Sequence, residues 1–145
     1  MAGRRRARIY ALQFLFAGDL NAWSNFEEEL ETFRTRFELT PETVPHFFTL
    51  VRGVREKRQQ IDTLLVEHSQ NWKISRMSGV DRNIMKIAVY EMMYCEDVPF
   101  KVAINEAIEI GKQFSTEDSG AFINGVLDSI RKKIEPQTKK DQTPS

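Results

Sequence analysis

The sequence is poor in several features that define whole classes of protein. Cys95 is the single cysteine in 145 residues, so neither an internal disulfide nor a cysteine zinc site can form, and a disulfide-stapled secreted domain is excluded. No apolar run approaches the length of about 18 residues that spans a membrane. Five prolines beside ten phenylalanines argue against bulk disorder. Net charge is also missing, because 21 basic side chains balance 21 acidic ones, which at face value speaks against a nucleic-acid partner.

The zero net charge conceals an uneven distribution. Residues 1–18 carry four arginines and no acid, whereas residues 19–45 carry seven acids and two arginines. A basic N-terminus therefore lies beside an acidic stretch. Because the basic patch is small and there is no overall positive field, we expect RNA binding by the chain alone to be modest and sensitive to salt.

The basic N-terminus followed by the apolar residues 9–17 loosely resembles a targeting signal. The apolar stretch is short, is interrupted by Gln13 and lacks a small-x-small cleavage site. Its helical periodicity fits a core helix instead. We therefore expect a cytoplasmic protein.

Hydrophobic periodicity predicts helices throughout, with no alternating strand pattern and no hairpin dipeptide. The predicted helices cover about residues 5–21, 25–37, 41–55, 56–69, 79–94, 99–114 and 119–134. The length fits one domain with a sizeable core, and the expected fold is all-α, a bundle of seven helices. The polar residues 135–145 are predicted to form a disordered tail.

Four helix starts carry capping signals. Ser24 with Glu27 matches a capping box, and Thr40 followed by Pro41 is an N-cap before proline. Ser78 is expected to cap the fifth helix, and residues 115–118, including Asp118, the seventh.

The sequence predicts which faces of two helices are buried. The first helix is expected to bury a stripe of Ile9, Leu12, Phe16 and Leu20. The body of the fifth, residues 84–94, is apolar on nearly every side, which places it at the centre of the core. In the last helix, a residue as small as Gly125 would permit close backbone approach.

The sequence contains no recognisable catalytic constellation. His46 and His68 lie in separate predicted helices without a motif, Cys95 has no flanking pattern, and no glycine-rich loop is present. We therefore expect no enzymatic activity, no metal and no cofactor.

The sharpest local feature is the run Arg4, Arg5, Arg6 and Arg8. These guanidiniums repel one another within one turn, at a helix start where the macrodipole disfavours cations, so a bound anion would relieve both effects. Gln13 could read a base edge, and nearby aromatic rings could stack on single-stranded RNA. A solubilising arginine run at a frayed terminus, with the phenylalanines packed in the core, is the competing interpretation.

Several ordered blocks of the sequence resemble the family of the transcription antitermination factor NusB. They are the arginine run with Ala11–Phe16, then DRNIMKIAVYE at 81–91, DVPFKVAINEA at 97–107 and FINGVLD at 122–128. The resemblance spans about residues 4–134, and between about 22 and 75 it rests on the helical pattern alone.

The resemblance implies one domain over residues 1–134, made of two packed helical halves at about 4–56 and 57–134. It also implies binding to the boxA element of ribosomal RNA leader transcripts together with NusE, a small-subunit ribosomal protein. In that complex, with other Nus factors, RNA polymerase reads through terminators.

The resemblance further assigns residues to two sites. The implied RNA-binding residues are Arg4, Arg5, Arg6, Arg8, Gln13, Phe16, Asp118 and Phe122. Phe16 replaces a tyrosine that is frequent in the family, which removes a possible hydroxyl contact. The implied NusE contact lies around Asp81 and Arg82. For Asp118 the sequence equally supports a helix-capping role.

Two other functions stay open at this point. A related helical domain precedes some ribosomal RNA methyltransferases, so a regulatory domain of that kind is one alternative. A purely protein-binding helical scaffold is the other. Self-association into a homodimer is also open, because spare aromatic side chains on a helical surface can form dimers.

Overall fold

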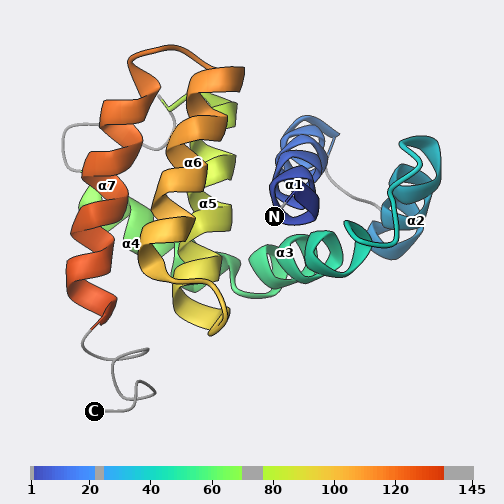
Figure 1. Cartoon of the computed structure of the whole chain (residues 1–145), viewed down its shortest axis with the longest axis horizontal. Helices are drawn as coiled ribbons and strands as arrows, with labels where there is room; N and C mark the ends of the chain where they lie inside the picture. Colours follow the sequence, from blue (N-terminus) through green and yellow to red (C-terminus); the bar gives the residue numbers. More distant parts are fainter. Residues whose placement is uncertain (1, 22–24, 70–76, 136–145) are drawn as a thin grey trace.

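The computed structural model describes residues 2–21, 25–69 and 77–135. Within these ranges it contains seven helices and no strand, so the prediction of an all-α, seven-helix fold is confirmed. The helices are α1 (Ala2–Asn21), α2 (Phe26–Arg36), α3 (Val44–Glu56), α4 (Arg58–His68), α5 (Gly79–Tyr94), α6 (Phe100–Phe114) and α7 (Ser119–Ile134). Figure 1 shows α1, α2 and α3 on one side and α5, α6 and α7 on the other.

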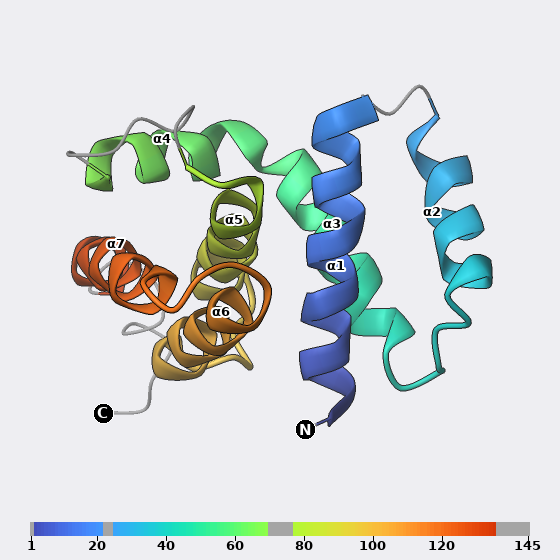
Figure 2. The ribbon, with the colours of Figure 1, turned by 90° about the horizontal axis from the view of Figure 1, so that it is seen from above.

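α5 is the central helix of the structure, as its all-round apolar character predicts. It packs against α1, α3, α4, α6 and α7, and Ile84, Met85, Val89 and Met92 on it are almost completely buried. Figure 2 shows α1 running between α2 on one side and α5 and α6 on the other. The start of the chain therefore links the two groups of helices.

An aromatic cluster holds α1, α2 and α3 together. The Phe14 ring meets the rings of Phe26, Phe33 and Phe47 edge-on, at centroid distances of 5.7, 5.4 and 6.1 Å. Tyr10 meets Phe33 in the same way at 6.2 Å. Phe14 is therefore a core residue, and only the more exposed aromatic side chains of α1 are left for a partner.

The helix starts differ partly from the capping predictions. Ser78 accepts a hydrogen bond from the backbone N–H of Asp81 at 3.0 Å, which confirms that cap. Asn25 caps α2 by accepting from Glu28 N–H at 3.4 Å, while Ser24 lies outside the described residues. The predicted start of the third helix at Pro41 is wrong. The carbonyl of Thr40 opens a turn over residues 41–43 instead, and α3 begins at Val44.

The buried face of α1 is rotated from the predicted one. Leu12 is buried, but Phe16 is 37% exposed and Leu20 71% exposed. Ala7 and Ala11 are fully buried instead. Because α1 is covered from two sides, by α3 and by α5, small residues that allow close helix approach lie inside.

The predicted polar tail lies, from residue 136 on, outside the described residues. In the part of the chain that is described, no helix combines the length and the apolarity needed to cross a membrane.

Candidate nucleic-acid interface

The arginine run occupies the first two turns of α1, and its members point in different directions. The side chains of Arg4 and Arg5 are 32% and 47% exposed, whereas that of Arg8 is 5% exposed. The repulsion between the arginines is relieved within the protein, because carboxylates of α5, α6 and the loop between them face three of the four guanidiniums.

Arg8 points into the bundle. Its Nε donates to both carboxylate oxygens of Glu91, at 3.0 and 2.9 Å, and its Nη1 donates to Glu106 Oε1 at 3.2 Å. Glu91 is fully buried and also lies 2.7 Å from His46 Nε2. In this conformation Arg8 offers no free guanidinium to a ligand. The sequence signal for this network is the glutamate at position 91, in a helix that is otherwise apolar and central.

Arg4 and Arg5 make ion pairs at the surface. Arg5 donates from Nε to Glu106 Oε1 at 2.9 Å and from Nη2 to Oε2. This contact, followed by the nearby charges of Arg5 and Arg8, lowers the pKa of Glu106 against the opposing effect of burial. Arg4 Nη2 contacts Asp97 Oδ2 at 2.5 Å and lowers the pKa of Asp97. A cavity of about 260 Å³ opens beside this pair, lined by Arg4, Arg8, Asp97, Val98, Pro99 and Val102.

Arg6, Gln13 and Phe16 form the exposed side of α1. Positions 6 and 13 lie seven residues apart, and position 16 follows on the same face. Within the described ranges, Arg6 is the member of the run for which no carboxylate partner is found. The Phe16 ring rests on the start of α5, where a Cβ on Gly79 would lie 2.5 Å from Cε1. Part of this ring therefore packs against α5, and the residue remains partly open to solvent.

Asp118 and Phe122 lie at the start of α7. Asp118 occupies the N-cap position, but its side chain makes no cap hydrogen bond, so the capping role considered for it is wrong. Ser119, the first residue of α7, instead accepts at Oγ from the backbone N–H of Thr116 at 3.3 Å, which closes the turn that leads into the helix. The Asp118 side chain is left exposed, while Phe122 is half-buried against the core.

The residues expected at a NusE contact tie α5 to its neighbours. Asp81 is 8% exposed, and its Oδ2 accepts from Ser119 Oγ at 3.1 Å. Arg82 Nη2 and Asn83 Nδ2 both donate to Asp19 Oδ2, at 3.0 and 2.7 Å. The start of α5 is thereby joined to the end of α1 and the start of α7. Of the expected pair, only Arg82 is partly exposed.

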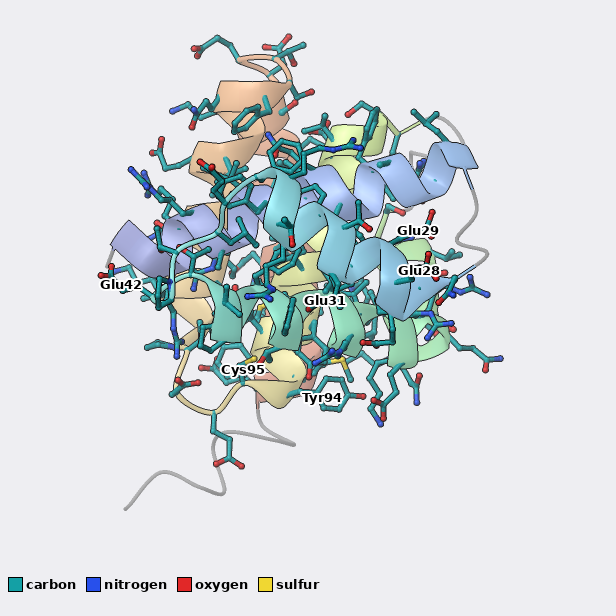
Figure 3. All side chains as sticks on the ribbon, turned by 90° about the vertical axis from the view of Figure 1, so that its right-hand side faces the viewer. Glu28, Glu29, Glu31, Glu42, Tyr94 and Cys95 are labelled. Atoms are coloured by element: carbon teal, nitrogen blue, oxygen red, sulfur yellow. The ribbon has the colours of Figure 1, made fainter. Side chains whose placement is uncertain are left out.

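The glutamates of α2, which are part of the acidic stretch, lie across α1 from α6. Figure 3 shows Glu28, Glu29 and Glu31 along α2, and Figure 2 places α2 across α1 from α6. These like charges make the α2 flank of α1 unfavourable for a polyanion.

The remaining reactive residues are packed or bonded. Cys95 is buried at the end of α5 (Figure 3), and His68 Nδ1 lies 2.6 Å from Ser129 Oγ. Among the described residues, no group of three potential metal ligands occurs. The fold and this surface define an all-helical protein whose charged side chains pair with one another around a basic helix start.

Comparison with known proteins identifies the family. The sequence profile of the NusB family matches residues 5–132. The transcription antitermination protein NusB of Desulfosudis oleivorans is 58% identical over 136 residues, covering 92% of this chain and 88% of that protein. The NusB of Desulfatibacillum aliphaticivorans is 46% identical, covering 98% and 99%.

Solved structures agree with this assignment. A T. maritima NusB structure superposes with a TM-score of 0.81 at 35% identity, covering 90% of this chain and 91% of that one. A complex of antitermination factors NusB and NusE with dsRNA contains the same fold, at a TM-score of 0.81, 24% identity and coverage of 92% and 98%. The chain belongs to the NusB family of transcription antitermination proteins, which is a non-enzymatic family.

Proposed function

We propose that this chain binds boxA-type single-stranded leader RNA of ribosomal RNA operons together with NusE. It would act in the cytoplasm, in an antitermination complex with RNA polymerase and other Nus factors, and promote read-through of terminators. The observation that carries the proposal is the gathering of Arg4, Arg5 and Arg6 at one accessible helix end, in a member of this family. The relative solved with NusE and dsRNA supports the choice of partners.

The proposed roles follow from the exposure of each side chain. Arg4, Arg5 and Arg6 bind phosphates, and Gln13 hydrogen-bonds a base edge. Phe16 and Phe122 offer partly open rings for stacking. The proposed RNA-binding set also includes Arg8 and Asp118. Asp118 can accept from a base amino group, whereas Arg8, being buried, acts as a positioning residue that holds Glu106 and Glu91 under the start of α1.

For NusE we propose the surface around the start of α5. Arg82 is the accessible member, and Asp81 acts indirectly by holding Ser119 at the start of α7. This arrangement predicts that Arg82→Ala weakens NusE binding directly, whereas Asp81→Ala acts by loosening the junction of α5 and α7.

The test is a titration of labelled boxA RNA with wild type and Arg6→Ala, at two salt concentrations, with and without NusE. Arg36→Ala is the matched control, because Arg36 is also exposed but lies at the end of α2. Loss of one phosphate contact should weaken binding about tenfold and reduce the salt slope by about one unit. Equal binding by wild type and Arg6→Ala would contradict the assignment of this surface.

Other outcomes would point to the competing functions. Binding of S-adenosylmethionine by the purified chain would favour a domain related to methyltransferases. A complex with NusE that RNA does not strengthen would favour a protein-binding scaffold. Sedimentation at several concentrations would show whether the chain forms the homodimer left open by its sequence.

A further inference from the structure

Two of the three guanidiniums proposed to contact RNA phosphates are already occupied by carboxylates of the same chain. Arg4 is paired with Asp97, in the loop before α6, and Arg5 with Glu106, on α6. A phosphate that binds either arginine must take the place of a carboxylate. The charge of the arginine run is therefore largely neutralised before any ligand arrives.

We propose that Asp97 and Glu106 are internal competitors of RNA phosphate, which set the affinity and the salt dependence of RNA binding at α1. The inference rests on the proposed RNA-binding function. RNA exchanges one anionic partner of Arg4 and Arg5 for another, and no new cation is exposed by the exchange.

The two pairs differ in how readily they can exchange. Asp97 is 66% exposed in its pair with Arg4, and solvent-exposed ion pairs of this kind are weak. Glu106 is 18% exposed and receives two hydrogen bonds from Arg5, a geometry that strengthens charge-assisted pairs. Removing the charge of Glu106 should therefore have the larger effect.

Glu106 can release Arg5 without becoming an unpaired charge. Its Oε1 accepts from Arg8 Nη1 at 3.2 Å as well as from Arg5. When Arg5 turns to a phosphate, Arg8 remains beside the carboxylate, and Glu91 anchors Arg8 in turn. Glu106 thus keeps one guanidinium partner, which it shares with Glu91, and it is also 18% exposed to solvent. The high cost of a buried charge without any partner is therefore avoided.

The exchange has a consequence for salt dependence. Arginine binding to RNA releases condensed cations from the phosphates, which makes affinity fall with salt. Each carboxylate that loses its arginine attracts cations again and offsets part of this release. Wild type should therefore show a shallower salt slope than a variant in which the competing carboxylate is neutral.

The test compares wild type, Asp97→Asn, Glu106→Gln and Glu31→Gln in titrations with boxA RNA at several salt concentrations, with and without NusE. Glu31→Gln is the matched control, because it removes the same charge from an exposed arginine pair on α2. Glu106→Gln keeps the shape and hydrogen-bond acceptor of the side chain. We expect RNA binding tighter by about two- to fivefold for Asp97→Asn, tighter still for Glu106→Gln, with steeper salt slopes and no change for Glu31→Gln.

Thermal unfolding of each variant separates binding from folding. If Glu106→Gln does not fold, Asp97→Asn still tests the inference, because the Arg4–Asp97 pair lies at the surface and its loss should not unfold the protein. If the wild type binds RNA but Asp97→Asn and Glu106→Gln bind it no more tightly than the wild type, this inference is overturned. The proposed function still stands in that case. Wild type that binds no RNA, with or without NusE, overturns both.

Discussion

Arg8 and Glu91 form a buried, two-bond ion pair between α1 and α5, with Nε to carboxylate oxygen distances of 3.0 and 2.9 Å. Their side chains are 5% and 1% exposed. His46 from α3 adds a third group to the pair. The pair, together with His46, thus joins α1 and α3 to the central helix α5, and it removes one arginine of the basic run from the surface.

Replacing Arg8 alone should destabilise the protein strongly. Arg8→Met removes the guanidinium that pairs with the buried Glu91 carboxylate, which should lower the free energy of unfolding by about 3–5 kcal/mol. Adding Glu91→Leu should recover much of that loss. Arg34→Met, which breaks the exposed pair with Glu31, should cost less than about 1 kcal/mol. Urea unfolding measures all three, and a loss for Arg8→Met as small as for Arg34→Met would contradict the structural role.

Two glycines should respond to alanine in opposite directions. A Cβ on Gly53 would lie 2.1 Å from Tyr90 Cζ, whereas a Cβ on Gly125 would have nothing within 4 Å. The expectation that Gly125 serves close helix packing is therefore wrong. Gly53→Ala should destabilise by about 1–3 kcal/mol, and Gly125→Ala should stabilise α7 by about 0.5–1 kcal/mol. If thermal unfolding finds Gly125→Ala less stable than Gly53→Ala, the close packing of Gly53 in α3 against Tyr90 is contradicted.

His68 should make stability depend on pH in the weakly acidic range. Burial lowers its pKa, the charge of Lys133 lowers it further, and Glu67 opposes the shift. Because the folded pKa lies below the unfolded value of about 6.5, the unfolded chain binds more protons. The stabilisation from neutral His68 is therefore fully present above the unfolded pKa, and it is lost as pH falls through the folded pKa.

The measurement is the urea midpoint from pH 7.5 to about pH 5, the range around the histidine pKa, for wild type and His68→Asn. Asparagine keeps an acceptor for the Ser129 hydroxyl but does not titrate. We expect the midpoint to fall more steeply with acid in wild type. Parallel curves for the two proteins would refute the role of His68.

Ser119 should be more important to stability than an ordinary surface hydroxyl. Its Oγ donates to Asp81 Oδ2 and accepts from Thr116 N–H, while Asp81 Oδ1 is buried without a hydrogen bond in the described structure. Ser119→Ala removes the donor to a carboxylate already short of partners, and should cost about 1–3 kcal/mol. Thr49→Ala, at an exposed position of α3, should stay within about 0.5 kcal/mol. If chemical unfolding shows equal losses of unfolding free energy for Ser119→Ala and Thr49→Ala, the role of Ser119 at the junction of α5 and α7 is contradicted.

The helices and several of their ends follow from local sequence. Ser78 caps α5 and the apolar body of α5 lies at the core, because both depend on residues within a few positions of one another. Where several residues compete locally, as around Thr40 and Asp118, the sequence pattern alone misplaces the cap.

The sequence by itself determined the all-helical fold, the family and the basic start of the chain. Tertiary structure alone decided which arginine of the run is buried, since four arginines in five positions look alike along a helix. Arg8 meets carboxylates 83 and 98 residues further along the chain, and that pairing exists only because α5 and α6 pack beside α1. Local patterns place charges on a helix, but the partners that neutralise them come from distant segments.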